Sequence, residues 1–331
     1  MSEPRVPIQA VVLCAGEGRR LRPYTERRPK PLLPLHNVPL LRHTLRLLAR
    51  SGVQRVALNA WYHAEQIQAF AESDPEPDLD LHVERETELL GTGGGLANLA
   101  GWRDDGPLLV LTSDVIGPFD LAGLAARHAE RDAEATMTLV TDADIERYGA
   151  VEMDDAGDLT DIVGLLGRPG TGAAVNGSVH VLSDDFLARL PAASLRASCL
   201  VRDGYVPALR DGATVTGFVH AGPWAEIGTP ELLLAAQRAV LAGTLPLDPE
   251  LTAESGRQVP ERSAIHAGAS VDSSAVLVET VVGPRARVGA GAELRDCLVL
   301  PGAHVADHGR HVSEVLDAAP VTAGLAEERG R

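Results

Sequence analysis

The sequence predicts an α/β protein: a doubly wound, mixed but mostly parallel sheet, followed by a short left-handed β-helix of hexapeptide repeats. Two observations predict the sheet. Short apolar runs such as residues 8–14 (IQAVVLC) and 107–112 (PLLVLT) are typical of parallel strands buried on both faces, and helical patterns alternate with them. The β-helix is predicted by apolar residues that recur every six positions near the C-terminus.

The first 243 residues alternate strand and helix patterns. The helix expected at 40–52 has leucines on one face, and the helix at 231–241 follows Thr229 as a cap and Pro230 as a first-turn proline. Further strands are expected at 148–153 and 175–182, in a mixed part of the sheet. The other expected elements are strands at 8–14, 53–60, 79–83, 107–112 and 136–141, and helices at 63–72, from 96 onward and at 121–131.

Four segments are expected along the chain. They are a large domain at 1–243, a linker at 244–258, the β-helix at 259–312 and a frayed tail at 313–331. Because so short a β-helix is not stable alone, we expect it to pack on the large domain or on a second subunit, in a homo-oligomer. The repeat positions are Val259, Ile265, Val271 and Leu277, then, after a one-residue slip, Val282, Val288, Leu294 and Leu300.

Charge and composition exclude several classes of protein. The chain has 331 residues, 45% of them hydrophobic, and a net charge of −16, which argues against nucleic acid or an anionic membrane as the main partner. Residues 1–55 nevertheless contain eleven Arg or Lys against three acids, so we expect an anion site there. Three cysteines without CxxC spacing indicate neither disulfides nor a zinc site, and the absence of a signal-peptide or membrane-span pattern predicts a cytoplasmic protein.

The strongest functional pattern is the stretch 13–35, which begins at the end of the first expected strand. It contains Lys30, the only lysine of the chain, and a compact ammonium suits a place between crowded phosphates. The small residues Ala15, Gly16 and Gly18 let backbone N–H groups approach an anion, and the arginines that follow add charge-assisted hydrogen bonds. The GKS or GKT of a P-loop and the third glycine of a dinucleotide-binding turn are missing, which disfavours both motifs.

Two carboxylates and a glycine run complete the candidate site. Asp114 ends an expected interior strand and Glu226 precedes a glycine turn, and Mg²⁺ prefers such oxygens together with substrate phosphates. The alternative for Asp114 is a cap of the following segment. The glycine run 91–95 suits a nucleoside lying against its backbone, and the alternative is a flexible loop.

Taken together, these motifs resemble a known family. The pattern Gly16-x-Gly18-x-Arg20-Leu21-x-Pro23-x-Thr25-x-x-x-Pro29-Lys30-Pro31-Leu32 resembles the signature of sugar-1-phosphate nucleotidyltransferases, the nucleotide-sugar pyrophosphorylases. Further motifs follow in the family's order, over about residues 8–243. They are LGTGGG at 90–95, Thr112-Ser113-Asp114, Tyr148-Gly149-Ala150-Val151, Asn176-Gly177-Ser178 and Trp224-x-Glu226-Ile227-Gly228-Thr229-Pro230.

The resemblance implies a Rossmann-like nucleotidyltransferase domain. Its reaction would be the attack of a sugar 1-phosphate on the α-phosphorus of a nucleoside triphosphate, with release of pyrophosphate. By this resemblance Arg20, Lys30 and Asp114 are catalytic, and Asp114 and Glu226 hold Mg²⁺. It assigns the nucleotide to Leu13, Ala15, Gly16, Gly18, Arg20, Gly91, Thr92 and Gly93, and the sugar phosphate to Tyr148, Gly149, Arg168 and Asn176.

Two positions depart from the family pattern. Glu226 stands where aspartate is usual, and Gly167-Arg168-Pro169 stands where Glu-Lys-Pro is usual. A glutamate still reaches a metal and an arginine still pairs with phosphate, but neither exchange preserves geometry. The alternatives are a non-catalytic regulatory subunit that binds nucleotide sugar, and a bifunctional enzyme whose repeat tail is an acyltransferase.

The substrates are predicted from fewer residues. A carboxylate from Glu86 or Glu88 suits the N1–H and N2–H₂ donors of guanine. The LGTGGG form and the repeat tail resemble the mannose-1-phosphate guanylyltransferase branch, so we expect GTP and mannose 1-phosphate or a related sugar phosphate. The alternative is a UTP-dependent N-acetylmuramate-1-phosphate uridylyltransferase. The chain resembles that family in its Asn176-Gly177-Ser178 motif and in having no lysine at position 168.

Overall fold

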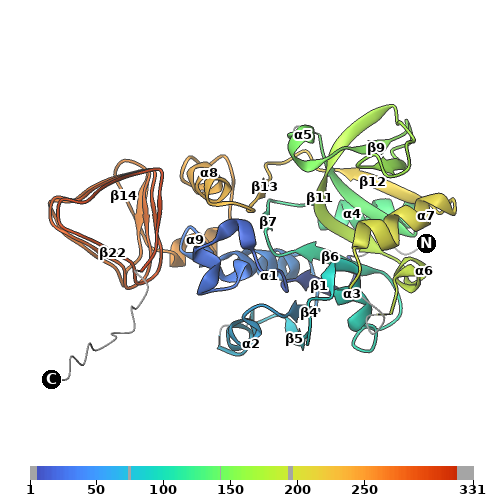
Figure 1. Cartoon of the computed structure of the whole chain (residues 1–331), viewed down its shortest axis with the longest axis horizontal. Helices are drawn as coiled ribbons and strands as arrows, with labels where there is room; N and C mark the ends of the chain where they lie inside the picture. The colour runs from blue at the N-terminus through green and yellow to red at the C-terminus, as the bar shows by residue number, and fades with distance from the viewer. Residues whose placement is uncertain (1–5, 74–75, 142, 193–196, 319–331) are drawn as a thin grey trace, which may run out of the picture.

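A computed structural model describes residues 6–73, 76–141, 143–192 and 197–318. The chain forms a large α/β domain and a three-sided C-terminal coil, and helices α8 (Pro230–Leu241) and α9 (Pro249–Glu254) lie between the sheet and the coil (Figure 1). In these described residues, no helix combines the length and the apolar character needed to cross a membrane.

The large domain is built on one nine-stranded sheet. Its first half is parallel: β1 (Gln9–Leu13) pairs on one side with β4 (Arg55–Ala60) and on the other with β6 (Leu108–Thr112). The strand at the edge of this half is β5 (Asp80–Arg85), which pairs with β4. The order of the strands therefore reverses at β1, and in open α/β sheets ligands bind at such a point, beyond the carboxyl ends of the strands.

The second half of the sheet is mainly antiparallel around the long strand β11 (Gly172–Leu182). This strand runs antiparallel to β6, β8 and β9, and a register shift between Asn176 and His180 interrupts its pairing with β8. The sheet is thus mixed, as predicted. The other strands of this half are β8 (Ala135–Val140), β9 (Val151–Met153), β10 (Leu159–Ile162) and β12 (Val215–Val219).

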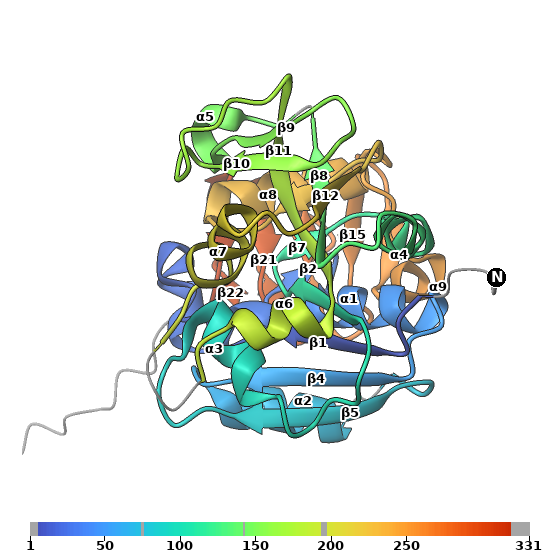
Figure 2. The same cartoon turned by 90° about the vertical axis from the view of Figure 1, so that its right-hand side faces the viewer.

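Helices cover both faces of the sheet, which explains the continuous apolar runs. Ala10 and Val12 of β1 belong to one buried core, with α1, α2 and α4, whereas Val11 belongs to the other, with α3, α6 and α7 (Figure 2). This arrangement confirms the doubly wound class. The helices are α1 (Leu40–Arg50), α2 (Ala64–Ser73), α3 (Gly91–Asn98), α4 (Leu121–Glu130), α5 (Ile145–Tyr148), α6 (Asp184–Arg189) and α7 (Val206–Arg210).

Several short elements border the site. Two small antiparallel pairs join β2 (Pro34–Leu35) to β3 (Val38–Pro39) and β7 (Val115–Ile116) to β13 (Ala225–Glu226). The 13–35 stretch itself contains three single 3₁₀ turns, η1 (Arg19–Leu21), η2 (Tyr24–Glu26) and η3 (Lys30–Leu32). A π-helical turn, η4 (Leu200–Tyr205), precedes α7.

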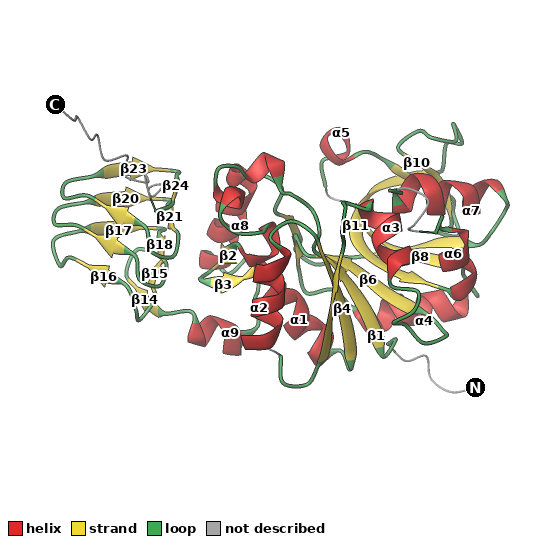
Figure 3. Cartoon of the chain, turned by 60° about the horizontal axis from the view of Figure 1, so that its bottom comes forward, coloured by secondary structure: helices red, strands yellow, loops and turns green. Residues whose placement is uncertain are grey.

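The C-terminal strands form three short sheets, one on each side of the three-sided coil of Figure 1, and Figure 3 shows the turns of the coil stacked on one another. Ile265 pairs with Val282 and Val282 with Val299, so one turn of the coil takes 17 residues. Each turn of the coil therefore has two steps of six residues and one of five, and the predicted one-residue slip occurs once per turn. The strands are β15 (Ser263–Ile265), β16 (Ser270–Val271), β17 (Val276–Val278), β18 (Val281–Val282), β19 (Arg287–Val288), β20 (Glu293–Arg295), β21 (Leu298–Val299), β22 (His304–Val305), β23 (Arg310–Val312) and β24 (Val315–Leu316).

The expected linker and tail both contain regular structure. Helix α9 occupies the middle of the linker, and the carboxylate of Asp248 caps it. Strand β14 (Arg257–Val259) is antiparallel to β15, so the parallel coil begins at Ser263 and not at Val259. Strand β24 continues the coil into the expected tail, whose residues 319–331 lie outside the described residues.

The coil packs on the large domain, which was one of the two expected arrangements. Leu33 and Leu40 of the large domain and Ala264, Val281 and Leu298 of the coil belong to one cluster of buried residues. The coil and the segment around the 3₁₀ turns are therefore in direct contact.

Candidate active site

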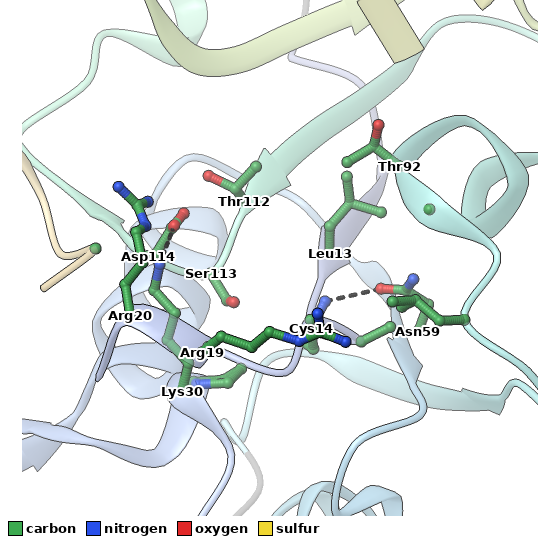
Figure 4. A pocket seen from close by; sticks show the side chains of 17 residues that line it. Leu13, Cys14, Arg19, Arg20, Lys30, Asn59, Thr92, Thr112, Ser113 and Asp114 are labelled. Atoms are coloured by element: carbon green, nitrogen blue, oxygen red, sulfur yellow. Dashed lines mark hydrogen bonds and ion pairs between the residues drawn. The ribbon is translucent and has the colours of Figure 1, made fainter. Parts of the chain in front are cut away.

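A cavity of about 440 Å³ lies where β1, β4 and β6 end (Figure 4). Asp114, Arg20 and Lys30 lie on one side of it, and Thr92 and Asn59 on the other. The predicted residues that line it are Leu13, Ala15, Gly16, Gly18, Arg20, Lys30, Gly91, Thr92 and Asp114. The lining does not include the predicted residues Glu86, Gly93, Tyr148, Gly149, Arg168, Asn176 and Glu226.

The loop after β1 is compact because Gly18 packs against two other residues of the motif. Gly18 has a φ of +61°, and a Cβ there would lie 2.9 Å from Cγ2 of Thr25 and 3.2 Å from Cβ of Lys30. The hydroxyl of Thr25 donates to the carbonyl of Gly18 at 3.0 Å. A side chain is therefore excluded at position 18, and the motif residues Gly18, Thr25 and Lys30 form one packed unit.

Asp114 and Glu226 lie together because β7 and β13 pair. The N–H of Ile227 donates to the carbonyl of Asp114 at 2.8 Å. The ammonium of Lys30 forms an ion pair with Oδ2 of Asp114 and lies 3.9 Å from Oε1 of Glu226. Nη2 of Arg20 lies 3.4 Å from the same Glu226 oxygen. Two carboxylates and two cations thus meet at the edge of the cavity.

The two carboxylates fit a divalent cation. Oε2 of Glu226 is buried without a hydrogen-bond partner in the described structure. Burial, and then the charge of Asp114, raises the pKa of Glu226, so a cation beside the pair would stabilise its charged form. No group of three or more His, Cys, Asp or Glu that could hold a metal occurs in the described part of the chain. The protein would therefore supply two ligands, and phosphate and water the others.

The glycine run 91–95 is not an open loop: it forms the first turn of α3. The backbone around Ser198 crosses this turn, and the carbonyl of Ser198 accepts a hydrogen bond from the N–H of Gly93 at 2.9 Å. A Cβ on Gly91 would lie only 2.5 Å from that carbonyl oxygen. Close packing of two backbone segments therefore requires the glycines, and the N–H of Gly93 is already used within the protein.

Glu86 braces the site instead of facing the cavity. Its Oε1 accepts a hydrogen bond from the amide of Asn59 at 2.7 Å, and its Oε2 accepts one from the N–H of Leu90 at 3.1 Å. Burial raises the pKa of this carboxyl. Recognition of guanine by Glu86, as predicted, would need a further hydrogen bond at an oxygen that is already engaged.

Asn59 is the most informative residue that the sequence analysis missed. It lines the cavity, and its side-chain carbonyl accepts a hydrogen bond from the N–H of Cys14 at 2.7 Å. It thereby ties the end of β4 to the loop after β1. A lone polar residue at the end of the apolar run RVALNA was the available signal. Leu89, Pro31 and Gly228 also line the cavity and were not predicted.

Aromatic residues stand next to Glu226, on the side expected for the sugar. The rings of Tyr148 and Trp224 meet edge to face, with centroids 5.3 Å apart. Burial, and then the charge of Glu226, raises the pKa of Tyr148. Nε1 of Trp224 is buried without a hydrogen-bond partner in the described structure. Gly149 follows with a φ of +86°, where a Cβ would clash with Val163.

Two predicted sugar-phosphate residues make other contacts. Nη1 of Arg168 donates to the carbonyl of Leu209 in α7 at 3.0 Å, and Arg168 does not line the cavity, so its contact with the sugar phosphate stays a prediction. The carbonyl of the Asn176 side chain accepts a hydrogen bond from the N–H of Ser178 at 2.7 Å, where the register of β11 shifts. The Asn-Gly-Ser motif therefore shapes a bulge in the sheet.

Comparisons with known proteins indicate a family for this chain. A family model described as "Nucleotidyl transferase" matches residues 9–243. The mannose-1-phosphate guanylyltransferase of Mycobacterium tuberculosis is 32% identical over 90% of this chain and 81% of its own length. The probable mannose-1-phosphate guanylyltransferase 1 of Oryza sativa subsp. japonica is 30% identical over 93% of this chain and 86% of its own.

Solved structures share the fold of the large domain. The crystal structure of HddC from Yersinia pseudotuberculosis superimposes with a TM-score of 0.57 at 24% sequence identity, and the match covers 69% of this chain and 97% of that one. At this level of identity the likeness concerns the fold alone. With the family match over residues 9–243 and a relative above 30% identity over most of the chain, this protein belongs to the nucleotidyl transferase family.

Proposed function

We propose that this enzyme converts GTP and mannose 1-phosphate into GDP-mannose and pyrophosphate. The names of the relatives from Mycobacterium tuberculosis and rice support the two substrates. The observation that best supports the chemistry is the placement of Lys30 against Asp114 and Glu226, at the edge of the cavity.

The proposed reaction needs no side-chain nucleophile. An oxygen of the sugar phosphate forms a bond to the α-phosphorus of GTP, the bond from that phosphorus to the bridging oxygen breaks, and pyrophosphate leaves with the electron pair. Catalysis then consists of positioning and charge stabilisation. Lys30 and Arg20 would stabilise phosphate oxygens, and backbone N–H groups of residues 15–18 would bind the triphosphate. Mg²⁺ held by Asp114 and Glu226 would neutralise part of the phosphate charge.

Selection of the base is the finer part of the proposal. Glu88 is exposed, and Glu86 is buried and engaged with Asn59 and Leu90. If either carboxylate accepts from guanine, Glu86→Gln and Glu88→Gln should weaken GTP more than UTP. Equal losses for the two nucleotides would refute a role in base selection. A lower melting temperature of Glu86→Gln alone would assign Glu86 to the support of α3.

The C-terminal coil and the assembly of the enzyme are also part of the proposal. We infer a left-handed β-helix; the parallel stacking of its strands supports a β-helix, and the left-handed sense is taken from the hexapeptide pattern. The homo-oligomer and the cytoplasmic location stay predictions.

The test is pyrophosphate release by the full chain with Mg²⁺. GTP, UTP, ATP and dTTP would each be combined with mannose 1-phosphate, glucose 1-phosphate and N-acetylmuramate 1-phosphate. We expect the highest kcat/KM for GTP with mannose 1-phosphate, and loss of activity with EDTA. A preference for UTP with N-acetylmuramate 1-phosphate would overturn the substrates. Binding of GDP-mannose without turnover of any pair would indicate a regulatory subunit instead.

A further inference from the structure

We propose that the C-terminal coil positions the phosphate-binding loop, and that Asp317 is the positioning residue through which it acts. This inference rests on the proposed function, because it assigns Asp317 to the catalytic step through Lys30. It goes beyond that function because it couples the last turn of the coil to a site in the other domain.

The coil holds the 3₁₀ turns through their side chains. The hydroxyl of Tyr24 donates to the carbonyl of Val315 in β24 at 2.9 Å. Directly after β24, Oδ1 of Asp317 lies 3.4 Å from Nη2 of Arg28, and its Oδ2 lies 3.9 Å from Nη1 of Arg27. The side chains of Asp317 and Arg28 are only 13% and 18% exposed, so solvent weakens this ion pair less than one on the surface. These contacts join residues about 290 positions apart in the sequence.

The large domain holds the same loop through its backbone. Nε2 of Gln66 donates to the carbonyl of Arg27 at 2.9 Å, and Nε2 of His63 lies 3.2 Å from the carbonyl of Glu26. Both residues lie at the start of α2. The backbone of this loop is therefore fixed by α2, while the side chains of Tyr24, Arg27 and Arg28 are fixed by the coil.

Arg28 and Tyr24, whose side chains the coil holds, are each linked to Lys30 through neighbouring residues. Arg28 is separated from Lys30 only by Pro29, whose restricted backbone transmits a displacement with little loss. Tyr24 is followed by Thr25, whose hydroxyl bonds to Gly18 and whose methyl group limits the space there. Because Gly18 also packs against Cβ of Lys30, a shift of Tyr24 or Arg28 changes the position of the Lys30 ammonium relative to Asp114.

The turns themselves are too short to fix this geometry. Each of η1, η2 and η3 contains three residues, so none forms a continuous helix. A displacement near 1 Å at a catalytic group is enough to cost about 100-fold in rate. An outside support is therefore expected for a loop of this kind, and the last turn of the coil is placed to supply it.

A second ion pair between the coil and the large domain provides a matched control. Nη1 of Arg238 in α8 lies 3.1 Å from Oδ2 of Asp296 in the coil, an oxygen that also accepts a hydrogen bond from the hydroxyl of Ser313 at 2.6 Å. Asp296→Asn should weaken the contact between the domains without touching the loop. If Asp317 served only to attach the coil, Asp317→Asn and Asp296→Asn would have the same effect.

The experiment compares the two variants in the full chain, with the substrate pair that the wild-type enzyme uses best. We expect Asp317→Asn to lower kcat about tenfold with little change in KM and in melting temperature, and Asp317→Glu to restore part of the rate. Asp296→Asn should stay within about twofold of the wild-type kcat. Tyr24→Phe removes one hydrogen bond to the same turn and should also lower kcat.

Equal kcat values for Asp317→Asn and Asp296→Asn, or a loss for Asp317→Asn that follows its melting temperature, would overturn the inference. Failure of the proposed function is distinguishable, because the wild-type enzyme itself would then show no turnover of GTP with mannose 1-phosphate.

Discussion

Lys30→Met is the most direct perturbation of the site. Methionine keeps an unbranched side chain of similar length and removes the ammonium that pairs with Asp114 and lies 3.9 Å from Glu226. At an effective dielectric constant of about 20, two unit charges at that separation interact by about 4 kcal/mol. Loss of one preorganised donor in an active site costs about 3–4 kcal/mol of transition-state stabilisation. We therefore expect kcat to fall about 100- to 1000-fold.

Lys30→Arg separates charge from shape. The guanidinium keeps the charge, but its planar fork is larger than an ammonium, and the side chain leaves a crowded place beside Gly18 and Thr25. We expect this variant to fold and to lose most of its turnover. The assay is steady-state pyrophosphate release, with the melting temperature measured in parallel.

Arg22→Met is the control for both variants of Lys30. Arg22 belongs to the same stretch, pairs with Glu17 at 3.4 Å and does not line the cavity, so its loss should leave kcat within about threefold of wild type. Near-normal rates of Lys30→Met or Lys30→Arg would refute a catalytic role for the only lysine of the chain.

Two further predictions concern stability. Gly95→Ala places a Cβ 2.5 Å from Nδ2 of Asn59 and should lower the free energy of unfolding by about 1–3 kcal/mol, as measured in urea titrations. Gly101→Ala is the control, because a Cβ there lies in open space and should leave the free energy of unfolding nearly unchanged. Equal free energies of unfolding for the two variants would contradict the packing argument. Burial lowers the pKa of His43 and of His180 from 6.5 to about 4, so these residues take up protons more readily in the unfolded chain. The free energy of unfolding is therefore unaffected by these two histidines above pH 6.5, and it falls by up to about 3 kcal/mol for each of them as the pH falls toward 4. Urea titrations at pH 7 and pH 5 check this prediction. Equal free energies of unfolding at the two pH values would contradict it.

The sequence predicted best the features that neighbouring residues determine. The run 8–14 predicts a strand because both faces of β1 are buried, as Val11 and Val12 show by belonging to different cores. The spacing of Gly18, Thr25 and Lys30 reflects contacts within one short loop. Such patterns survive without knowledge of the rest of the fold.

The repeat length of the coil shows how a local pattern can mislead. The five-residue step recurs between Leu294 and Val299, but Leu300 is also apolar and extends the six-residue spacing by coincidence. Only the hydrogen-bonded register, which aligns Val282 with Val299, distinguishes the two.

The contacts at the site that the sequence did not predict come from long-range packing. Gly91, Gly93 and Gly94 are explained by Ser198, more than 100 residues away, and no local pattern reports that contact. The position of Arg168 depends on a carbonyl of Leu209, because its loop folds toward α7. Glu86 was assigned to the base from its chemistry, but the fold places Asn59 and Leu90 against it. Residue type indicates what a side chain can bind, whereas tertiary structure decides what it does bind.

The balance of charge at the carboxylates leads to a last prediction. Asp114 and Glu226 bear two negative charges, and Lys30 and Arg20 provide two positive charges within 4 Å of them. In the protein without nucleotide, a divalent cation would enter a pair that is already neutralised, and the ammonium would repel it. If the triphosphate binds as proposed, Lys30 would interact with phosphate oxygens and the carboxylates would become available. In the absence of nucleotide, the affinity of Lys30→Met for Mn²⁺ should therefore be higher than that of the wild type by about tenfold or more. Electron paramagnetic resonance of free Mn²⁺ measures this affinity. Asp114→Asn should abolish that gain. Equal Mn²⁺ affinity of the wild type and Lys30→Met would show that the ammonium does not compete for the carboxylates.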